Sequence, residues 1–219
     1  MDLNILIYEY MKAKSNSIKE KIKSYYNGNC SLYNENLSCN DHSKELFHFQ
    51  GKILDLGCGT LENGYNALSG VHVVALDINE KAIEKARIKA KENYTDIKID
   101  FTVANMEDIP FEDNEFDGVF SNCVVNHSKN KQKVFHEIYR VLKPGGTLVL
   151  SDAFTREPLP ERISNDPEHI AGCFGGAELI GNYLNYFINC GFTQINIQKN
   201  REYIKNGFDF ISATMVAKK

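Results

Sequence analysis

The sequence predicts an α/β fold: a mostly parallel sheet with helices on both faces and an antiparallel terminal strand. Short apolar runs alternate with segments in which apolar residues recur at helical spacing, as in strands joined by crossover helices. The run at 53–56 leads into a turn with two glycines, which is typical of a strand followed by a ligand-binding loop. With 219 residues, 42% of them hydrophobic, the chain can bury one sizeable core, so we expect a single domain overall.

Seven segments are predicted to be strands, in agreement with a seven-stranded sheet. The last two are expected to form a strand pair at the end of the chain. The segments are 53–56, 71–76, 97–103, 116–121, 147–151, 193–198 and 208–217.

Two helices are predicted between these strands. The segment 79–93 places small and apolar side chains at helical spacing, and Asn79 is positioned to cap its first turn. A second apolar stripe runs from Val134 to Val141 and stops before Pro144, which cannot continue a helix. Pro144 and the two glycines after it predict a turn before the strand at 147–151.

We divide the chain into an N-terminal helical cap, residues 1–50, and a main domain, residues 51–219. In the cap, Ile18, Ile22 and Tyr26 recur at helical spacing beside lysines that we expect to face solvent. Residues 152–178 are predicted to form a long loop, and a long loop in a compact domain is usually functional or disordered.

Composition excludes several classes of function. A net charge of −4 gives no reason to expect a nucleic-acid partner. No apolar run approaches the ~20 residues of a membrane span, and no charged-then-apolar leader precedes a cleavage site. We therefore expect a cytoplasmic protein without a membrane partner, whose six cysteines are reduced rather than disulfide-bonded.

The segment 53–60 predicts a site for an adenosine cofactor. Gly57 and Gly59 let the backbone turn tightly and let a ligand lie against the main chain. Asp77 ends the second apolar run, where a carboxylate can accept both hydroxyls of a ribose. Glu62 stands where nicotinamide enzymes usually carry a third glycine, so the dinucleotide fingerprint fails.

Four stretches, in the right order, resemble the motifs of class I S-adenosylmethionine (SAM)-dependent methyltransferases, which have a Rossmann-like fold. They are Asp55–Thr60, Asn105–Phe111, Phe116–Ser121 and Leu142–Gly146. The resemblance implies SAM as the cofactor and a small molecule as the methyl acceptor. The cofactor-binding residues that we expect are Asp55, Gly57, Gly59, Asp77, Ile78, Asn105, Met106 and Ser121.

Roles follow for several residues of this set. Asp55 is expected to orient the glycine loop or to reach the cofactor's ammonium group through water. Ile78 and Met106 would pack against the adenine ring. The side-chain oxygen of Asn105 would accept a hydrogen bond from the adenine amine.

Three cysteines from separate segments are predicted to converge on the acceptor. Cys123 follows the fourth strand, Cys173 lies in the long loop, and Cys39 lies in the cap. Thiolates favour thiophilic centres, and the sequence lacks the close Cys-x-x-Cys pairs of a zinc ribbon. The alternative is that these cysteines are small buried hydrophobes, which is our interpretation of Cys58 and Cys190.

Around these cysteines the chain resembles a narrower family, the arsenite methyltransferases. The resemblance runs through Ser121–Asn126, Leu159–Glu161, Gly172–Ala177 and Phe210–Thr214. It implies that Cys39, Cys123 and Cys173 bind trivalent arsenic as the substrate, without a resident metal, and that Cys30 stands for a fourth family cysteine. It also implies a thiol reductant of the thioredoxin or glutathione type as a partner.

Two other functions stay open. The chain could methylate an oxygen or nitrogen of a small organic acceptor, bound or deprotonated by Asn126, His127 or Glu178. It could also bind SAM or a metalloid without turnover. Under the arsenite hypothesis, His127 and His169, which lie near two of the thiols in sequence, would lower the thiol pKa.

Overall fold

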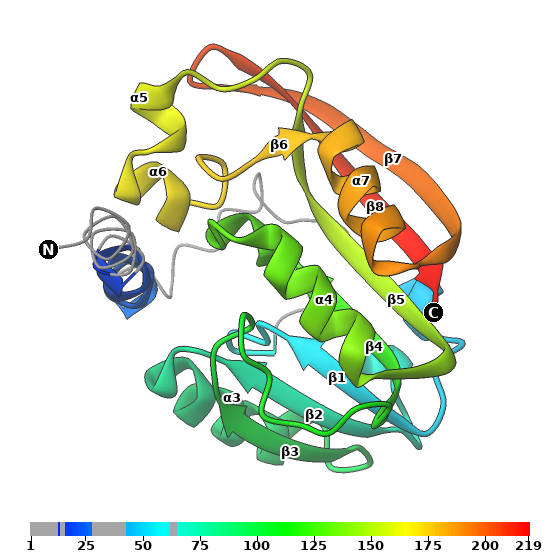
Figure 1. Ribbon diagram of the computed structural model, residues 1–219. Helices are drawn as coiled ribbons and strands as arrows, with labels where there is room; N and C mark the ends of the chain where they lie inside the picture. Colours follow the sequence, from blue (N-terminus) through cyan, green and yellow to red (C-terminus); the bar gives the residue numbers. More distant parts are fainter. Residues whose placement is uncertain (1–12, 14–15, 28–42, 62–64) are drawn as a thin grey trace, which may run out of the picture.

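The computed structural model describes residue 13 and residues 16–27, 43–61 and 65–219. Cys30, Cys39 and Glu62 lie outside these residues, so what the sequence predicts for them stays a prediction. In the described part, one sheet crosses the domain and helices pack on both of its faces (Figure 1).

The strands follow the order β3-β2-β1-β4-β5-β8-β7, and a short strand, β6, pairs with β5 beside this path. The pairs from β3 to β5 are parallel, whereas β8 is antiparallel to both of its neighbours. The predicted mostly parallel sheet with an antiparallel terminal strand is therefore confirmed. The strands are β1 (Lys52–Leu56), β2 (His72–Asp77), β3 (Lys98–Val103), β4 (Phe116–Asn122), β5 (Leu142–Thr155), β6 (Glu178–Leu179), β7 (Thr193–Lys205) and β8 (Phe208–Lys218).

Alternation along the strands creates two cores, one on each face of the sheet. In β1, Leu54 and Leu56 belong to the core that α4 and α7 cover, whereas Ile53 belongs to the core that α3 covers. All three side chains are fully buried. The helical elements are α2 (Ser43–Leu46), η2 (Tyr65–Ala67), α3 (Glu80–Asn93), η3 (Val125–His127), α4 (Lys131–Val141), α5 (Glu161–Ser164), α6 (Pro167–Ala171) and α7 (Ile180–Cys190).

Local sequence signals locate the ends of α3 and α4. Asn79 caps α3 as predicted, because its side chain accepts a hydrogen bond from the Lys81 amide at 3.1 Å. Helix α4 ends at Val141, but the strand after it begins earlier than predicted, so that Pro144 lies inside β5. The register between β4 and β5 shifts at this point, and such a bulge tolerates a residue that has no amide proton.

The predicted long loop at 152–178 is wrong in its extent. β5 is longer than predicted, and α5, α6 and β6 occupy much of the remainder. Asp166 caps α6, because its side chain accepts the amide protons of Glu168 and His169, and Pro167 takes the first helical position. This Asp-Pro pair is a local helix-start signal that can be recognised from the sequence alone.

A helix at 16–27 packs against α6. Its residues Ile18 and Ile22 are buried in one cluster with Ile170 and Ala171. The helical spacing in the sequence therefore marks a buried face. The division of the whole chain into a cap and a main domain stays a prediction.

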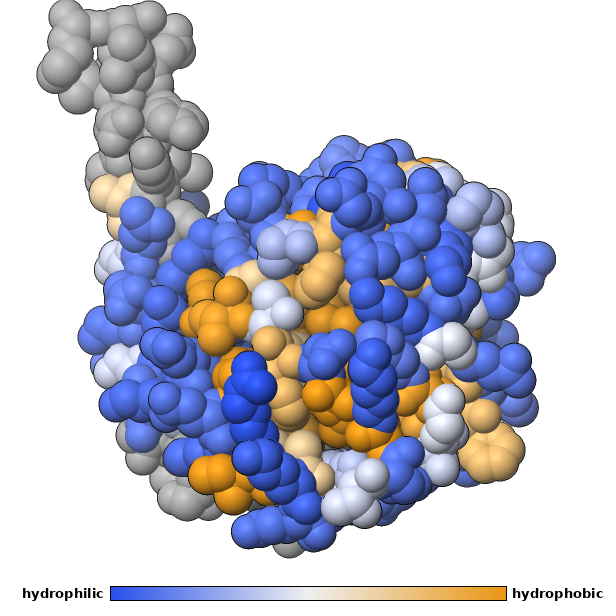
Figure 2. Space-filling model, turned by 90° about the horizontal axis from the view of Figure 1, so that it is seen from below, coloured by the Kyte–Doolittle hydropathy of each residue, from blue (hydrophilic) through white to orange (hydrophobic). Residues whose placement is uncertain are grey.

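None of the described helices combines the length and the apolar character needed to cross a membrane. Figure 2, a view from below Figure 1, shows apolar side chains gathered near the centre of that face and bordered by hydrophilic ones. Ile88 of α3 and Val103 of edge strand β3 are both more than half exposed. Exposed apolar residues are ordinary on a protein surface and by themselves assign no partner.

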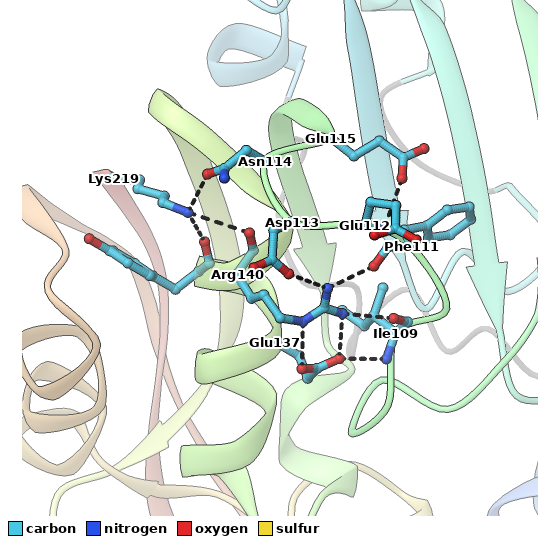
Figure 3. A network of polar contacts seen from close by, with 10 residues as sticks. Ile109, Phe111, Glu112, Asp113, Asn114, Glu115, Glu137, Arg140 and Lys219 are labelled. Atoms are coloured by element: carbon cyan, nitrogen blue, oxygen red, sulfur yellow. Dashed lines mark hydrogen bonds and ion pairs between the residues drawn. The ribbon is translucent and has the colours of Figure 1, made fainter.

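Arg140 of α4 fastens the segment that leads from β3 to β4 (Figure 3). Its guanidinium donates to the carbonyls of Phe111 at 2.7 Å and Ile109 at 2.8 Å. Glu137 holds the same guanidinium with both carboxylate oxygens, each at 2.9 Å, and also accepts the Ile109 amide proton at 2.8 Å. Because this segment carries the residues predicted to contact adenine, the network helps to determine where they lie.

Replacing Arg140 by Met is expected to lower the free energy of unfolding by about 2–3 kcal/mol, because two carbonyls and the Glu137 carboxylate lose a charged donor. Arg156→Met is the matched control. It should cost less than about 1 kcal/mol, because the Arg156–Glu202 ion pair is largely exposed. Urea unfolding measured by circular dichroism compares the two, and equal losses would contradict the role given to Arg140.

Candidate active site

The predicted site residues gather at the carboxyl ends of the parallel strands. β1 lies between β2 and β4, so the strand order reverses beside it, and ligands of open α/β sheets bind at such a point. The glycine turn follows β1, Asp77 ends β2, and Cys123 follows β4. Helix 16–27 lies on the same side, since the Tyr26 hydroxyl is 3.1 Å from Nε2 of His127 in η3.

Asp77 holds the glycine turn in place. One of its carboxylate oxygens accepts the Gly59 amide proton at 2.9 Å, and the other accepts the Asn79 amide proton at 2.8 Å. Two further amides of the turn donate to the carbonyl of Leu76. The Ile78 amide bonds to the same carboxylate, which is therefore fixed by three amides and still keeps a lone pair that a ligand can use.

The two glycines of the turn have different roles. Gly57, at φ +81°, lies against Val124, because an added Cβ would be 2.4 Å from that side chain. At Gly59, with φ +50°, no atom of the described residues lies within 4 Å of the position that a Cβ would take. A ligand can therefore approach the main chain at Gly59, whereas Gly57 lets the turn after β4 pack closely.

Asp55 and Ser121 are buried rather than aimed into an open cleft. Asp55 is 5% exposed and accepts a hydrogen bond from the Tyr65 hydroxyl at 2.5 Å. This bond ties β1 to η2, and both roles expected of Asp55, orienting the glycine turn and reaching the cofactor's ammonium group, stay predictions. Ser121 is 1% exposed and donates to the Leu56 carbonyl at 2.8 Å, where it stabilises the pairing of β1 and β4, and its contact with the cofactor stays a prediction.

The residues expected around adenine are partly exposed. Ile78, Asn105 and Met106 are all half-buried. Oδ1 of Asn105 accepts the Glu107 amide proton at 3.2 Å, so the oxygen expected to meet adenine already closes a local turn. Met106 packs against the core that α4 covers. Their contacts with adenine stay predictions.

The structure brings Cys123 and Cys173 together and adds a third group. The two sulfurs and a carboxylate oxygen of Asp152 all lie within 4.8 Å of one another. Both cysteines have a left-handed backbone, with φ of +57° at Cys123 and +70° at Cys173. Residues with a side chain rarely adopt this conformation, and those that do are concentrated at functional sites.

Close packing of two loops sets the positions of these sulfurs. An added Cβ on Gly176 would lie 1.7 Å from the carbonyl oxygen of Asn126, so only glycine lets the loop after α6 approach the turn after β4. The single proton of the Cys173 thiol lies between two acceptors, the Cys123 carbonyl at 3.3 Å from Sγ and Oδ1 of Asp152 at 3.5 Å from Sγ. The acceptor loops are therefore joined by direct contact as well as by the sheet.

Asp152 lies within β5 and is fully buried. Its Oδ1 accepts hydrogen bonds from the Asn126 side chain at 2.7 Å and the Ala153 amide at 2.9 Å, and its Oδ2 accepts the Asn126 amide proton at 3.1 Å. Tyr183 of α7 donates to Oδ1 of Asn126 at 2.7 Å. Sequence reasoning missed Asp152, although an acid within an apolar strand is the signal that could have revealed it.

Burial dominates the protonation of the acceptor site. It raises the pKa of the Cys173 thiol well above its usual value, and the Asp152 charge acts in the same direction. Burial also raises the pKa of Asp152 to about 6 and lowers that of His127 to about 4. The hypothesis that a nearby histidine lowers the thiol pKa is therefore wrong for His127, because that ring is neutral at pH 7.

The cysteines differ in burial and oxidation state. Cys58 is a buried free thiol and Cys190 a half-buried one, in agreement with their interpretation as small hydrophobes. Cys173 is also free. Cys123 is disulfide-bonded, so the expectation of six reduced cysteines is wrong. Its sulfur must be reduced before it can bind a metalloid.

Most of this site lies in a segment that matches a known family. A family profile described as a methyltransferase domain matches residues 48–191. The chain belongs to the class I SAM-dependent methyltransferases. The fixed carboxylate of Asp77 fits the ribose of SAM because it offers acceptors, and Gly59, which no described side chain crowds, fits close approach of the ligand to the main chain.

The relatives of this methyltransferase act on different acceptors. An arsenite methyltransferase of Halobacterium salinarum is 32% identical over 181 residues, which are 76% of this chain and 46% of the relative. A 24-methylenesterol C-methyltransferase of Arabidopsis thaliana is 36% identical over 132 residues, which are 59% of this chain and 37% of the relative. The methyltransferase thus spans half or less of the length of these curated relatives.

A solved structure supports the same fold. The arsenic(III) SAM methyltransferase from Chlamydomonas reinhardtii superposes with a TM-score of 0.65 at 26% identity. The match covers 77% of this chain and 63% of the other.

Asp77→Asn is expected to weaken binding of S-adenosylhomocysteine, the demethylated cofactor, by about tenfold or more. Asparagine has one uncharged acceptor oxygen where aspartate has two charged ones. The ribose therefore loses an acceptor, and the hydrogen bonds that hold the glycine turn are weakened. Asp100→Asn is the matched control, because Asp100 is an exposed acid of β3 that pairs with His72. Isothermal titration calorimetry gives both affinities, and unchanged binding in Asp77→Asn would contradict the proposed ribose contact.

Asp55→Asn is expected to change how stability depends on pH. Burial, followed by the Asp77 charge, raises the pKa of Asp55 to about 7, against an opposing hydrogen bond from Tyr65. Between pH about 4 and 7 the folded protein therefore keeps a proton that the unfolded chain has lost, and stability falls as pH rises. The variant carries no charge, so it should gain at least about 1 kcal/mol over the wild type at pH 8 and little at pH 4.

Denaturant unfolding at both pH values measures this difference. Acids away from Asp55 titrate equally in the two proteins, so the comparison isolates Asp55 and the groups in contact with it. A stability difference that is the same at pH 4 and pH 8 would show that folding does not raise the pKa of Asp55.

Proposed function

We propose that this methyltransferase transfers methyl groups from SAM to trivalent arsenic held by Cys123 and Cys173. The observation that supports it is the sulfur pair: two cysteines from distant segments lie within 4.8 Å, both with left-handed backbone. An inert core cysteine has no need of that strained conformation. The similarity to the Halobacterium and Chlamydomonas enzymes, which methylate arsenite or arsenic(III) according to their names, points to the same acceptor. Cys39 stays a predicted third thiol.

The protonation of the site suits a neutral arsenic acid. The Cys173 thiol keeps its proton at pH 7, because burial raises its pKa. Arsenite in water is also neutral. Each As–S bond then forms as one As–O bond breaks, and the thiol proton leaves with the hydroxyl as water. No charge has to enter the buried site, so the high pKa of this thiol is no obstacle.

The protein's part in methyl transfer is to position the reactants and exclude water. We propose that Asp77 binds the ribose of SAM and that Ile78, Asn105 and Met106 contact its adenine. Bound SAM supplies a methyl group on a sulfonium sulfur, which the arsenic lone pair takes up as the carbon–sulfur bond breaks. The lone pair is already a nucleophile, so the chain does not need a general base.

Arsenic passes from the trivalent to the pentavalent state when it gains the methyl group. Two thiols of a reductant can return it to the trivalent state, because they lose two electrons and two protons and become a disulfide. The arsenic oxygen leaves as water in the same step. We therefore propose a thiol reductant of the thioredoxin or glutathione type as a partner.

The residues expected to act on an organic acceptor are all engaged elsewhere. Asn126 is fully buried and bonds to Asp152. The ring nitrogens of His127 contact the Ile170 carbonyl at 2.9 Å and a tyrosine hydroxyl at 3.1 Å. Glu178 forms an ion pair at 3.0 Å with a buried lysine. A general base must reach the proton that it removes, so these contacts favour arsenic over an organic acceptor.

Reduced protein incubated with SAM, arsenite and excess thiol should yield methylated arsenic, measured by arsenic speciation. Cys123→Ser and Cys173→Ser should each lower the rate by about 100-fold or more, because each removes a ligand of arsenic. Cys190→Ser is the matched control and should keep the activity, because that thiol belongs to the end of α7.

Three other outcomes would count against the proposal. Full activity in both serine variants would separate the sulfurs from the reaction. Methylation of a sterol or another organic molecule, with none of arsenite, would assign a different acceptor. Tight arsenite binding without a methylated product would indicate a metalloid-binding protein.

A further inference from the structure

Helix 16–27, drawn in blue in Figure 1, contacts both sides of the proposed adenine site. Its Asn27 accepts a hydrogen bond from the side chain of Asn79 at 3.2 Å. Its Lys19 forms a partly buried ion pair with Glu107, also at 3.2 Å. Asn79 and Glu107 each directly follow a residue that is expected to pack on adenine. The helix therefore joins two loops between which the cofactor is proposed to bind.

The strand order shows what lies between the contacts of this helix. β1 lies between β2 and β4 in the sheet, and the glycine turn follows β1. The helix contacts Asn79 after β2, and it contacts His127 after β4. The carboxyl ends of parallel strands meet at one edge of the sheet, where ligands of such folds bind. Because the helix is held on both sides of β1, it crosses this edge at the proposed cofactor site.

We propose that helix 16–27 gates the cofactor site, so that the cofactor binds and leaves when the helix lifts from Glu107 and His127. The inference goes beyond the proposed function. It rests on the proposed place of the cofactor at Asp77 and does not depend on the identity of the methyl acceptor. Glu107 and His127 are then positioning residues, because they hold the helix rather than the cofactor.

One contact of the gate is a neutral hydrogen bond between Tyr26 and His127. Nδ1 of His127 lies 2.9 Å from the Ile170 carbonyl, which is an acceptor, so Nδ1 carries the ring proton. Burial lowers the pKa of His127 to about 4, so the ring is neutral at pH 7 and its Nε2 accepts. The Tyr26 hydroxyl is therefore the donor at 3.1 Å, and Tyr26→Phe removes this hydrogen bond without changing any charge.

Glu107 connects the helix with both halves of the site. One of its carboxylate oxygens pairs with Lys19, and the other accepts a hydrogen bond from the Ser128 hydroxyl at 2.7 Å. Ser128 directly follows η3, in the turn after β4. The Glu107 amide donates to the side chain of Asn105 at 3.2 Å. The carboxylate that holds the helix thus also joins the adenine loop to the acceptor turn.

The strength of these contacts suits a gate that opens without unfolding the domain. A neutral hydrogen bond and a partly buried ion pair each contribute modestly to stability. Ile18 and Ile22 add apolar contact with α6 rather than with the central sheet. The helix can therefore lift as a local unit while the sheet stays folded.

The association and dissociation rates of S-adenosylhomocysteine, measured by surface plasmon resonance on the whole chain, test the inference. Lys19→Met and Tyr26→Phe should each raise both rates by about two- to fivefold, because each weakens the closed position. The dissociation constant should change less than either rate, since a gate slows binding and release alike. Lys23→Met and Tyr25→Phe are the matched controls and should leave both rates unchanged, because Lys23 pairs with Glu20 on the helix itself.

A charge exchange guards against a general loss of structure. Lys19→Glu should raise both rates, because two carboxylates then face each other. Lys19→Glu/Glu107→Lys should restore the wild-type rates, because the ion pair forms again with its charges exchanged. All samples contain the same excess of thiol, so the oxidation state of Cys123 is common to every variant.

The outcomes separate this inference from the proposed function. Unchanged rates in Lys19→Met and Tyr26→Phe would overturn it. So would a rise in the dissociation rate alone, because these side chains would then hold the bound cofactor and not a gate. Unchanged binding in Asp77→Asn would overturn the proposed place of the cofactor and the gate with it. No acceptor is present in these measurements, so none of the results bears on arsenic.

Discussion

The acceptor site depends on one close contact between two loops, the turn after β4 and the loop after α6. Gly176 meets the Asn126 carbonyl at a point where no Cβ fits, and this contact sets the spacing of Cys123 and Cys173. Asn126 also bonds to both oxygens of Asp152. The sulfur pair and the carboxylate beside it therefore share a single anchoring residue, so their geometries are coupled.

Strand order sets the position of the proposed cofactor site at the ends of β1 and β2. Helix 16–27 connects this cofactor half of the site with the acceptor half around Cys123 and Cys173. Its Asn27 contacts the side chain of Asn79, two residues after the proposed ribose ligand, at 3.2 Å. Its Tyr26 contacts His127, four residues after Cys123, at 3.1 Å. The helix thus packs across elements that carry both halves, and its buried isoleucines rest on α6, which leads into Cys173.

Much of the fold was predictable because the signals are local. Strand runs, the Asn79 cap and the apolar stripe of α4 each depend on neighbours within a few residues, and the structure contains all of them. The Asp166-Pro167 start of α6 was equally local and was overlooked. Asp55 and Ser121 were assigned to the cofactor from their place in a motif, yet their hydrogen bonds go to Tyr65 and the Leu56 carbonyl. The position of a residue in a motif predicts that it lies at the end of a strand, but it does not predict the hydrogen-bond partner of its side chain.

The sequence by itself determined the fold class. It also identified the glycine turn, Asp77 and the cysteines as candidates for the site, because residue type and periodicity carry that information. Only the tertiary structure placed Cys123 and Cys173 side by side and added Asp152 to them. It also decided that these two sulfurs lie in a site where burial keeps the Cys173 thiol protonated. Distances and desolvation arise when segments far apart in the chain pack together, and no local pattern specifies which segments will meet.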